Sequence, residues 1–277
     1  GKIQRLVVQA SMIQFGIQAF GFLIAAYADE LGAATMLLLQ FTALQIGMVA
    51  YIKLKLPYQR PAPVNKHLLK QISESVLEGF LTVKVSPYLR AVAFQNVAMG
   101  TFFMGSYIVT IPLLIRELYQ GGSVELSWLN AANSFGIVVT ILYLMRIGDI
   151  HRQGRALLLA QGIGCVALAC GGLGLGFYSL LGSIFLWGMC GGFALTMSRT
   201  IMQERAPEKQ RARIMAIYSF SLLGAIPIGA LVSGYLVKWM GASDALITSS
   251  ILMLIFVIFT SLSSTLWSLD AKPASHP

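Results

Sequence analysis

Eight long apolar stretches limit what this chain can fold into more than any other feature of its sequence. Each is close to the roughly 20 residues that an α-helix needs to cross the hydrocarbon core of a membrane. A single segment in that core must pair its own backbone N–H and C=O groups, and a helix does so. We therefore predict an all-α polytopic membrane protein with eight transmembrane helices, at residues 6–28, 34–56, 89–115, 125–147, 156–177, 179–201, 213–238 and 243–266.

Composition supports this class and excludes others. Apolar residues make up 56% of the chain and charged residues 11%, which leaves too little polar surface to cover a soluble domain of this size. The net charge of +9 does not indicate a nucleic-acid partner, because the basic residues form short clusters between apolar stretches. Cys165, Cys170 and Cys190 lie inside apolar stretches without metal or redox spacing, so we expect no metal and no cofactor.

The distribution of basic residues predicts the orientation in the membrane. If the N-terminus is connection zero, the even-numbered connections carry 18 of the 20 Lys and Arg residues, and the odd-numbered ones carry Arg116 and Lys238. Cytoplasmic connections carry the excess of Lys and Arg in membrane proteins. Both termini of this chain are therefore expected in the cytoplasm, with the lipid bilayer as a partner.

The connection at residues 57–88 is much longer than the others. It opens with Pro57, Pro61 and Pro63, which end the preceding helix. It then becomes amphipathic, with Leu69, Ile72, Val76, Phe80 and Val83 at helical spacing opposite Lys66, Lys70, Glu74 and Glu78. Such a helix either lies on the membrane surface or is a solvated linker, and the sequence leaves both open.

An internal repeat indicates that the chain is part of a larger bundle. The first and seventh stretches align without a gap at an offset of 208 residues, which pairs Arg5 with Arg213, Gly16 with Gly224, Gly21 with Gly229, Leu23 with Leu231 and Tyr27 with Tyr235. Parallel repeats of helical bundles are common in transporters. On this logic roughly 120 residues precede Gly1 in a twelve-helix parent. The missing N-terminal helices of the same polypeptide are then the chain's main protein partner.

Three segments resemble the major facilitator superfamily, specifically bacterial efflux members of the enterobactin-exporter kind. Residues 144–155 (LMRIGDIHRQGR) resemble its loop signature, and residues 203–218 (QERAP through RARIMAIY) resemble the connection between its tenth and eleventh helices. Residues 77–90 are similar to the entry into its seventh helix. The resemblance implies helices five to twelve of a partial fold, with residues 1–56 ending the N-terminal bundle, 57–88 as a cytoplasmic linker, and 89–277 as the C-terminal six-helix bundle.

The resemblance also implies two bundles that rock about a central cavity, with a gate in the cytoplasmic connections. A carboxylate among arginines at helix ends can form charge-assisted bonds that hold such a gate. The gating residues are Asp149, Arg152, Arg155 and Arg213; Ile150 and His151 replace the family's usual basic residues, so no role is carried over to them. The alternative is that the arginines only fix topology.

Polar residues inside the apolar stretches are the candidates for substrate binding, because such side chains face protein or water. They are Gln95, Asn96, Tyr107, Asn130 and Asn133. In the family the corresponding two helices line the cavity, which favours binding; the alternative is hydrogen bonding between neighbouring helices. Gly224, Pro227 and Gly229 form a candidate hinge, or a kink that does not move.

All 11 acidic residues lie in connections or at the ends of stretches, so the coupling group of a proton-driven transporter is expected in the missing helices. The predicted function is proton-coupled efflux of a small amphipathic compound, such as a drug or a siderophore-like molecule, across the cell (inner) membrane. The alternative is a truncated fragment that inserts but does not transport. A membrane enzyme would need His/Glu pairs, paired aspartates or a Ser/Lys dyad within the stretches, and a channel would need a filter or a charged ring; neither pattern is present.

Overall fold

The computed structural model describes residues 2–53, 68–148, 150–267 and 269, and this part of the chain is helical without any β-strand. Within the described residues, each predicted apolar stretch lies mostly on helix. The elements are α1 (Lys2–Ala25), α2 (Ala28–Lys53), α3 (Leu68–Val85), α4 (Pro87–Ala98), the π-helix η1 (Met99–Gly105), α5 (Ser106–Leu118), α6 (Ser123–Ile147), α7 (Gln153–Gly172), α8 (Phe177–Arg205), the 3-10 turn η2 (Glu208–Gln210), α9 (Arg211–Leu223) and α10 (Ala225–Ser263).

Six helical runs among the described residues are long and apolar enough to cross a membrane, and the segment Met12–Ala25 of α1 is a shorter apolar helix. One of the six runs, Arg211–Ser263, contains the predicted stretch 213–238 and most of the stretch 243–266. Gly241 separates them, because its φ of 82° and ψ of 168° interrupt the helix inside α10. A residue without a Cβ adopts that backbone at no steric cost. The chain is thus an all-helical, multi-pass membrane protein.

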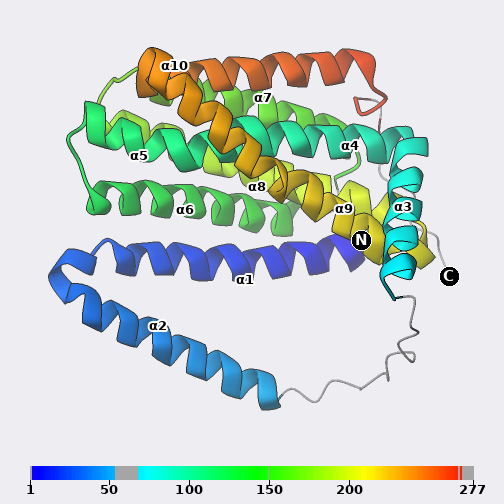
Figure 1. Ribbon diagram of the computed structural model, residues 1–277, viewed down its shortest axis with the longest axis horizontal. Helices are drawn as coiled ribbons and strands as arrows, with labels where there is room; N and C mark the ends of the chain where they lie inside the picture. The colour runs from blue at the N-terminus through cyan, green and yellow to red at the C-terminus, as the bar shows by residue number, and fades with distance from the viewer. Residues whose placement is uncertain (1, 54–67, 149, 268, 270–277) are drawn as a thin grey trace.

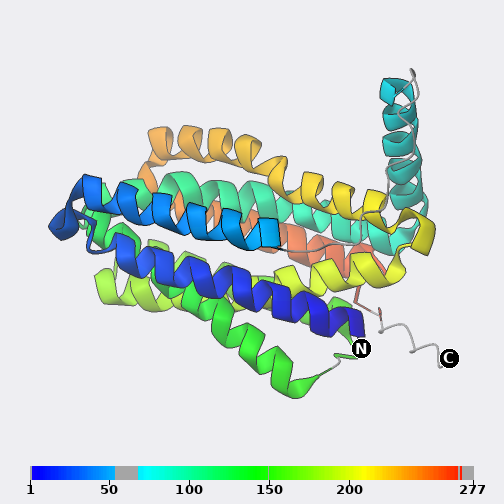
Figure 2. The same ribbon diagram turned by 90° about the horizontal axis from the view of Figure 1, so that it is seen from below.

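The long helices run side by side along one direction (Figures 1 and 2). α6, α7 and α8 pack together with the continuous α4–η1–α5 rod and with α10, while α1 lies along α6. α2 diverges from α1 and leaves its apolar side chains exposed. α3 crosses the end of the bundle, roughly perpendicular to the other helices in both views.

Many basic residues gather at the end of the bundle where α3 lies, where α4 and α9 begin and α8 ends. We call this the basic end; it includes Arg90 near the start of α4, Arg205 at the end of α8, and Arg211 and Arg213 at the start of α9. The proline-rich segment 57–67 and Asp149, both named in the sequence analysis, lie outside the described residues.

Glycines bring two pairs of helices into backbone contact. On α8, a Cβ added to Gly188 would lie 2.2 Å from the carbonyl oxygen of Asn133 on α6. On α10, a Cβ added to Gly229 would lie 2.2 Å from the carbonyl oxygen of Thr101 in η1. Small residues permit such close approach in membranes, where dispersion contacts rather than apolar burial hold helices together.

The π-helix explains how η1 meets α10 so closely. Gly100 faces the carbonyl oxygen of Leu222 and Gly105 faces Gly229, at 2.3 Å and 2.4 Å from the added Cβ positions. Residues five apart lie on different sides of an α-helix, whereas the i→i+5 bonding of a π-helix turns them toward the same side. The π-turn therefore presents both glycines to the α9–α10 rod.

Candidate functional site

Two polar side chains of α4 are buried in the middle of the bundle and bridge to neighbouring helices. Gln95 Nε2 donates to Gln161 Oε1 on α7 at 2.5 Å, and Ser198 Oγ on α8 donates to Asn96 Oδ1 at 2.6 Å. Gln161 Nε2 in turn reaches Met99 Sδ at 3.6 Å. Both α4 residues are at most 1% exposed. Hydrogen bonding between neighbouring helices is the alternative to substrate binding that the sequence left open. Contact of Gln95 and Asn96 with substrate therefore stays a prediction.

The same amides retain unused hydrogen-bonding capacity. Gln95 Oε1 and Asn96 Nδ2 are buried without a partner among the described residues. An unpaired polar atom in an apolar interior costs free energy, on the order of 1–3 kcal/mol. The contact of α4 with α7 and α8 is therefore held by two amides, each of which leaves one polar atom unpaired among the described residues.

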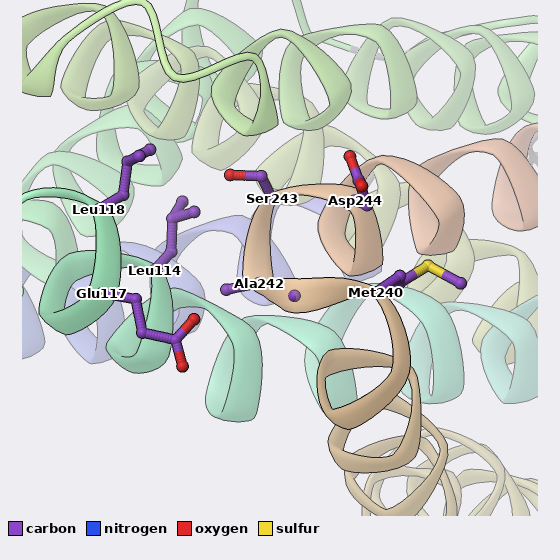
Figure 3. A pocket seen from close by; sticks show the side chains of 8 residues that line it. Leu114, Glu117, Leu118, Met240, Ala242, Ser243 and Asp244 are labelled. Atoms are coloured by element: carbon purple, nitrogen blue, oxygen red, sulfur yellow. The ribbon is translucent and has the colours of Figure 1, made fainter.

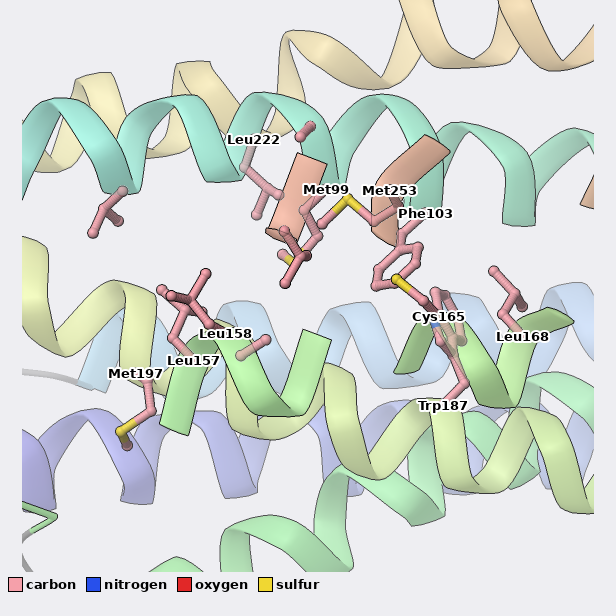
Figure 4. Close-up of a cluster of buried hydrophobic side chains, with 14 of the residues drawn as sticks. Met99, Phe103, Leu157, Leu158, Cys165, Leu168, Trp187, Met197, Leu222 and Met253 are labelled. Carbon is pink, nitrogen blue, oxygen red and sulfur yellow. The ribbon is translucent and has the colours of Figure 1, made fainter. Parts of the chain in front are cut away.

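A second polar group lies between α5, α6 and α8. Tyr107 Oη donates to Asn130 Oδ1 at 2.9 Å, and Asn130 Nδ2 donates to the carbonyl oxygen of Leu126 at 2.9 Å. The ring of Tyr107 stacks on Trp187, with centroids 4.9 Å apart and planes 24° apart. Phe103 meets the same indole edge-on, with centroids 5.7 Å apart, and Figure 4 shows the two side chains next to each other in the core. Phe103, Trp187 and Tyr107 therefore form one aromatic surface, and the Tyr107 hydroxyl joins it to the carboxamide of Asn130.

Asn133 lies one helical turn after Asn130 on α6, as predicted, but the two are placed differently. The backbone of Asn133 lies against Gly188, and Asn133 remains partly exposed. Ile137, one turn further, packs against Met12 and Phe15 of α1. The structure therefore joins Tyr107 to Asn130, and places Asn133 beside the contact between α6 and α8.

Trp187 is part of this group, although it is not among the candidate residues predicted from the sequence. It is buried on α8, and its Nε1 has no partner within the described part of the chain. No local pattern in the sequence marks Trp187, because its ring partners Phe103 and Tyr107 come from η1 and α5.

Of the predicted gating residues in the connection between α6 and α7, Arg152 and Arg155 are described. Arg152 is exposed and directly precedes α7. Arg155 donates through Nε to the carbonyl oxygen of Trp267 at 3.0 Å and lies 5.4 Å from the centroid of that indole ring. No local pattern indicates this partner, which directly follows the last predicted apolar stretch.

The chain after α10 crosses the start of α7. A Cβ added to Gly154 would lie 1.9 Å from the carbonyl oxygen of Leu266, so the two backbones touch. Next to it, the buried Gln153 donates through Nε2 to Glu204 Oε2 on α8 at 3.0 Å. The start of α7 is thus tied to the end of α8 and to the segment that follows α10.

The fourth gating residue, Arg213, pairs with Glu78 on α3. Gln210 joins the pair, since its Nε2 donates to Glu78 Oε1 at 3.1 Å and its Oε1 accepts from Thr82 Oγ1 at 2.7 Å. All four residues belong to α3, η2 or the start of α9, which meet at the basic end. Among the described residues, which do not include Asp149, Arg213 therefore contacts the linker helix α3.

The candidate hinge lies between α9 and α10. Gly224 keeps right-handed helical angles (φ −67°, ψ −22°), and Pro227 follows in the first turn of α10, where its missing N–H breaks no bond that the next helix requires. Gly229 lies against Thr101, as described above. The structure places these residues at a helix junction, and hinge motion there stays a prediction.

A comparison with protein families matches residues 93–276 to the family described as Major Facilitator Superfamily. The match spans two thirds of the chain, from α4 to its end. The chain belongs to the major facilitator superfamily. A comparison with curated proteins gave no match.

Membership explains the architecture and assigns the general activity. The superfamily consists of membrane transporters, so this chain is a membrane transporter with a helical, multi-pass fold. The matched residues begin inside α4 and include Tyr107, Asn130 and Trp187. α1, α2 and α3 lie before the matched region.

A pocket of about 160 Å³ lies between the end of α5 and the turn in α10 (Figure 3), at the end of the bundle opposite the basic end (Figure 1). Glu117 of α5 and Asp244 of α10 flank it, with Met240 and Ser243 from the turn at Gly241. In the part of the chain that the structure describes, no three His, Cys, Asp or Glu residues are close enough to hold a metal ion.

Proposed function

We propose that this chain is the greater part of a secondary active transporter of the efflux type, which moves a small amphipathic compound outward in exchange for protons. In this proposal it corresponds to helices five to twelve, with residues 1–56, 57–88 and 89–277 as the end of one bundle, the linker and the second bundle. The membrane is the cell (inner) membrane, and both termini of the chain are cytoplasmic.

The orientation is supported by the separation of basic residues. Eighteen of 20 Lys and Arg residues belong to the even-numbered connections, and the basic end of the bundle gathers many of them on one side. Because cytoplasmic connections carry the excess of Lys and Arg, we assign the basic end to the cytoplasm.

The observation that carries the substrate class is the contact of Tyr107 with Asn130 and Trp187. Stacked rings offer a flat apolar surface, and a carboxamide offers both a donor and an acceptor without charge. Such a combination suits a ligand with an apolar body and a few polar groups. The partly exposed Asn133 is included in the proposed site, because it adds a second carboxamide one turn away.

Gln95 and Asn96 are included as contacts of a different kind. Their partners Gln161 and Ser198 occupy them here, so they reach substrate only when α4 moves relative to α7 and α8. The unpaired Gln95 Oε1 and Asn96 Nδ2 are the atoms available for such a contact.

The proposed gate comprises Asp149, Arg152, Arg155 and Arg213. In this structure Arg155 holds the segment after α10 and Arg213 holds α3, so the two arginines tie different elements to the basic end. Breaking both contacts would free the starts of α7 and α9 to move apart, as rocking requires. For proton coupling, we place the titrating group outside the described spans, because none of the described acidic residues is buried.

The test is transport by the purified full-length protein in sealed vesicles with an imposed pH gradient. A panel of neutral and cationic amphipathic dyes serves as substrates, and we expect dye movement that follows the gradient and stops when a protonophore collapses it. Tyr107→Ala should weaken movement of flat dyes most. Movement that ignores the gradient would contradict proton coupling. If the 277-residue chain inserts without transport while the full-length protein transports, the fragment interpretation holds for the chain alone.

A further inference from the structure

Arg199 is a cation inside one of the membrane-spanning helices. It lies within the predicted apolar stretch 179–201, six residues before the end of α8 at Arg205, which is about 9 Å along the helix axis. The helix dipole stabilises a cation only within the last turn, so it does not account for this position. A charged side chain at such depth is costly, and it faces protein or a water-filled cavity where it serves a function.

The surroundings of Arg199 are protein rather than lipid. The residues before and after it on α8, 196–198 and 200–202, are all at most 3% exposed. They cover nearly two turns, so every side of this part of α8 is packed. Arg199 is half-buried and its Nε is fully buried. Its side chain therefore does not extend along a lipid-facing surface to the headgroups, as arginines at membrane boundaries do.

The guanidinium of Arg199 has no counter-charge in the described part of the chain. Its Nε lacks a hydrogen-bond partner, and no hydrogen bond or ion pair joins the side chain to another described residue. By contrast, Arg213 pairs with Glu78, and Arg205 lies over the ring of Tyr88 at 5.1 Å from its centroid. An unpaired cation in apolar surroundings costs free energy, which a bound anion would recover.

Two further donors are linked to Arg199 through its neighbours. Ser198 donates to Asn96 Oδ1 and leaves Asn96 Nδ2 without a partner among the described residues. The hydroxyl of Tyr218 on α9 interacts with Ser198 and with the charge of Arg199, and its bond to the carbonyl oxygen of Leu195 is long, at 3.5 Å. Three helices, α4, α8 and α9, thus bring together donors that exceed the acceptors around them.

We propose that Arg199, Tyr218 and Asn96 form a subsite for the oxyanion group of an amphipathic substrate, such as a carboxylate. The guanidinium fork matches the two oxygens of a carboxylate, and the hydroxyl and the amide supply additional donors. Asn96 and Tyr107 are 11 residues apart on the α4–η1–α5 rod (107 − 96), about 16 Å, so the acid group binds nearer the basic end than the aromatic surface does. The role as a substrate subsite rests on the proposed efflux function, whose substrate it narrows to amphipathic organic anions.

The subsite is tested with two ligands that share one apolar body. A dansyl-labelled medium-chain fatty acid carries a carboxylate, and its primary amide carries no charge. Both are titrated onto the purified full-length protein in mild detergent, at a pH where the acid is ionised, and dansyl fluorescence reports the affinity. Arg199→Gln removes the cation. Arg90→Gln, at an exposed position near the start of α4, is the matched control for the loss of one positive charge from the basic end.

We expect the acid to bind the original protein about tenfold more tightly than the amide, as one charge-assisted contact implies. In Arg199→Gln the affinity for the acid should fall to that for the amide, which should itself stay unchanged. In Arg90→Gln the preference for the acid should remain. Tyr218→Phe should reduce this preference several-fold and leave the affinity for the amide unaltered. Retained binding of the amide shows that each variant is folded.

Equal binding of the acid and the amide to the original protein would overturn the subsite, and so would a preference for the acid that survives in Arg199→Gln. If Arg199→Gln does not fold, Tyr218→Phe and the comparison of the two ligands on the original protein decide. An anionic phospholipid offers the same oxyanion chemistry, so the titration is repeated with phosphatidylglycerol or with zwitterionic phosphatidylcholine. Displacement of the acid by phosphatidylglycerol alone would assign the site to a lipid headgroup and overturn its role for substrate.

The subsite and the efflux function fail in different ways. If neutral and cationic dyes follow the pH gradient but the acid is not preferred over the amide, the efflux function stands and the subsite is wrong. If the acid binds through Arg199 but no compound is transported, the anion-binding site stands and the efflux function is wrong.

Discussion

Gly229 belongs to the candidate hinge and also packs against η1. Replacing it with alanine tests which of these two roles the residue has. In the structure its Cα faces the backbone of η1, and an added Cβ would lie 2.2 Å from the carbonyl oxygen of Thr101 and 2.7 Å from its Cα. Both neighbouring atoms belong to backbone, so no side-chain rotation relieves the overlap. Gly229→Ala should therefore push η1 and α10 apart.

The size of the effect follows from the overlap. Cβ atoms essentially never approach a neighbour closer than 3.0 Å, so the helices must separate by about 1 Å. Overpacking of this kind costs about 1–3 kcal/mol. Gly234 in the same helix is the matched control, because a Cβ there would meet nothing within 4 Å. Gly234→Ala should gain up to about 1 kcal/mol from helix propensity alone.

The assay is equilibrium unfolding of the purified protein in mild detergent, together with transport by the full-length protein. We expect Gly229→Ala to be less stable than the original protein, and Gly234→Ala to be at least as stable. If Gly229→Ala is as stable as Gly234→Ala and only transport is lost, the residue is a hinge and the packing explanation is wrong.

Three further predictions concern the basic end and the orientation. Arg213→Gln should lower the free energy of unfolding by no more than about 1 kcal/mol, because its ion pair with Glu78 is exposed. The same change should speed amide hydrogen exchange in residues 77–85, and unchanged exchange would show that the pair does not hold α3. Asp149→Asn should impair transport without reducing abundance in the membrane, and unaltered export would leave the connection as a topology signal. A membrane-impermeant thiol reagent added outside intact cells should modify Gly122→Cys and spare Arg152→Cys, and the opposite pattern would reverse the orientation.

The spans could be predicted because membrane insertion depends on a local property, the length of each apolar stretch. Even the break inside α10 is visible locally, as Gly241 between two such stretches. The π-turn at Met99–Gly105 could not be predicted from apolar periodicity, since nothing in the composition of this stretch departs from its neighbours. The five-residue spacing of Gly100 and Gly105 acquires meaning only when α10 is seen beside it.

The candidate site was predicted as a set of residues but not as a set of contacts. Tyr107 and Asn130 were both singled out as polar residues in apolar stretches, yet their mutual hydrogen bond depends on the packing of α5 on α6. Arg155 was paired with the local acid Asp149, whereas its described partner is Trp267, 112 residues away. Contacts of that range arise from tertiary packing, which a single sequence does not encode in any local pattern.

The most direct test of the proposed substrate site is the substrate profile and melting temperature of Asn133→Ala, measured beside Asn130→Ala. Asn130 accepts the Tyr107 hydrogen bond, so its loss should reduce both stability and substrate affinity. For Asn133→Ala we expect an unchanged melting temperature, with affinity weakened about fivefold, as the loss of one hydrogen bond worth about 1 kcal/mol implies. A lowered melting temperature with an unaltered substrate profile in both variants would show that these carboxamides only join helices, and would contradict the proposed site.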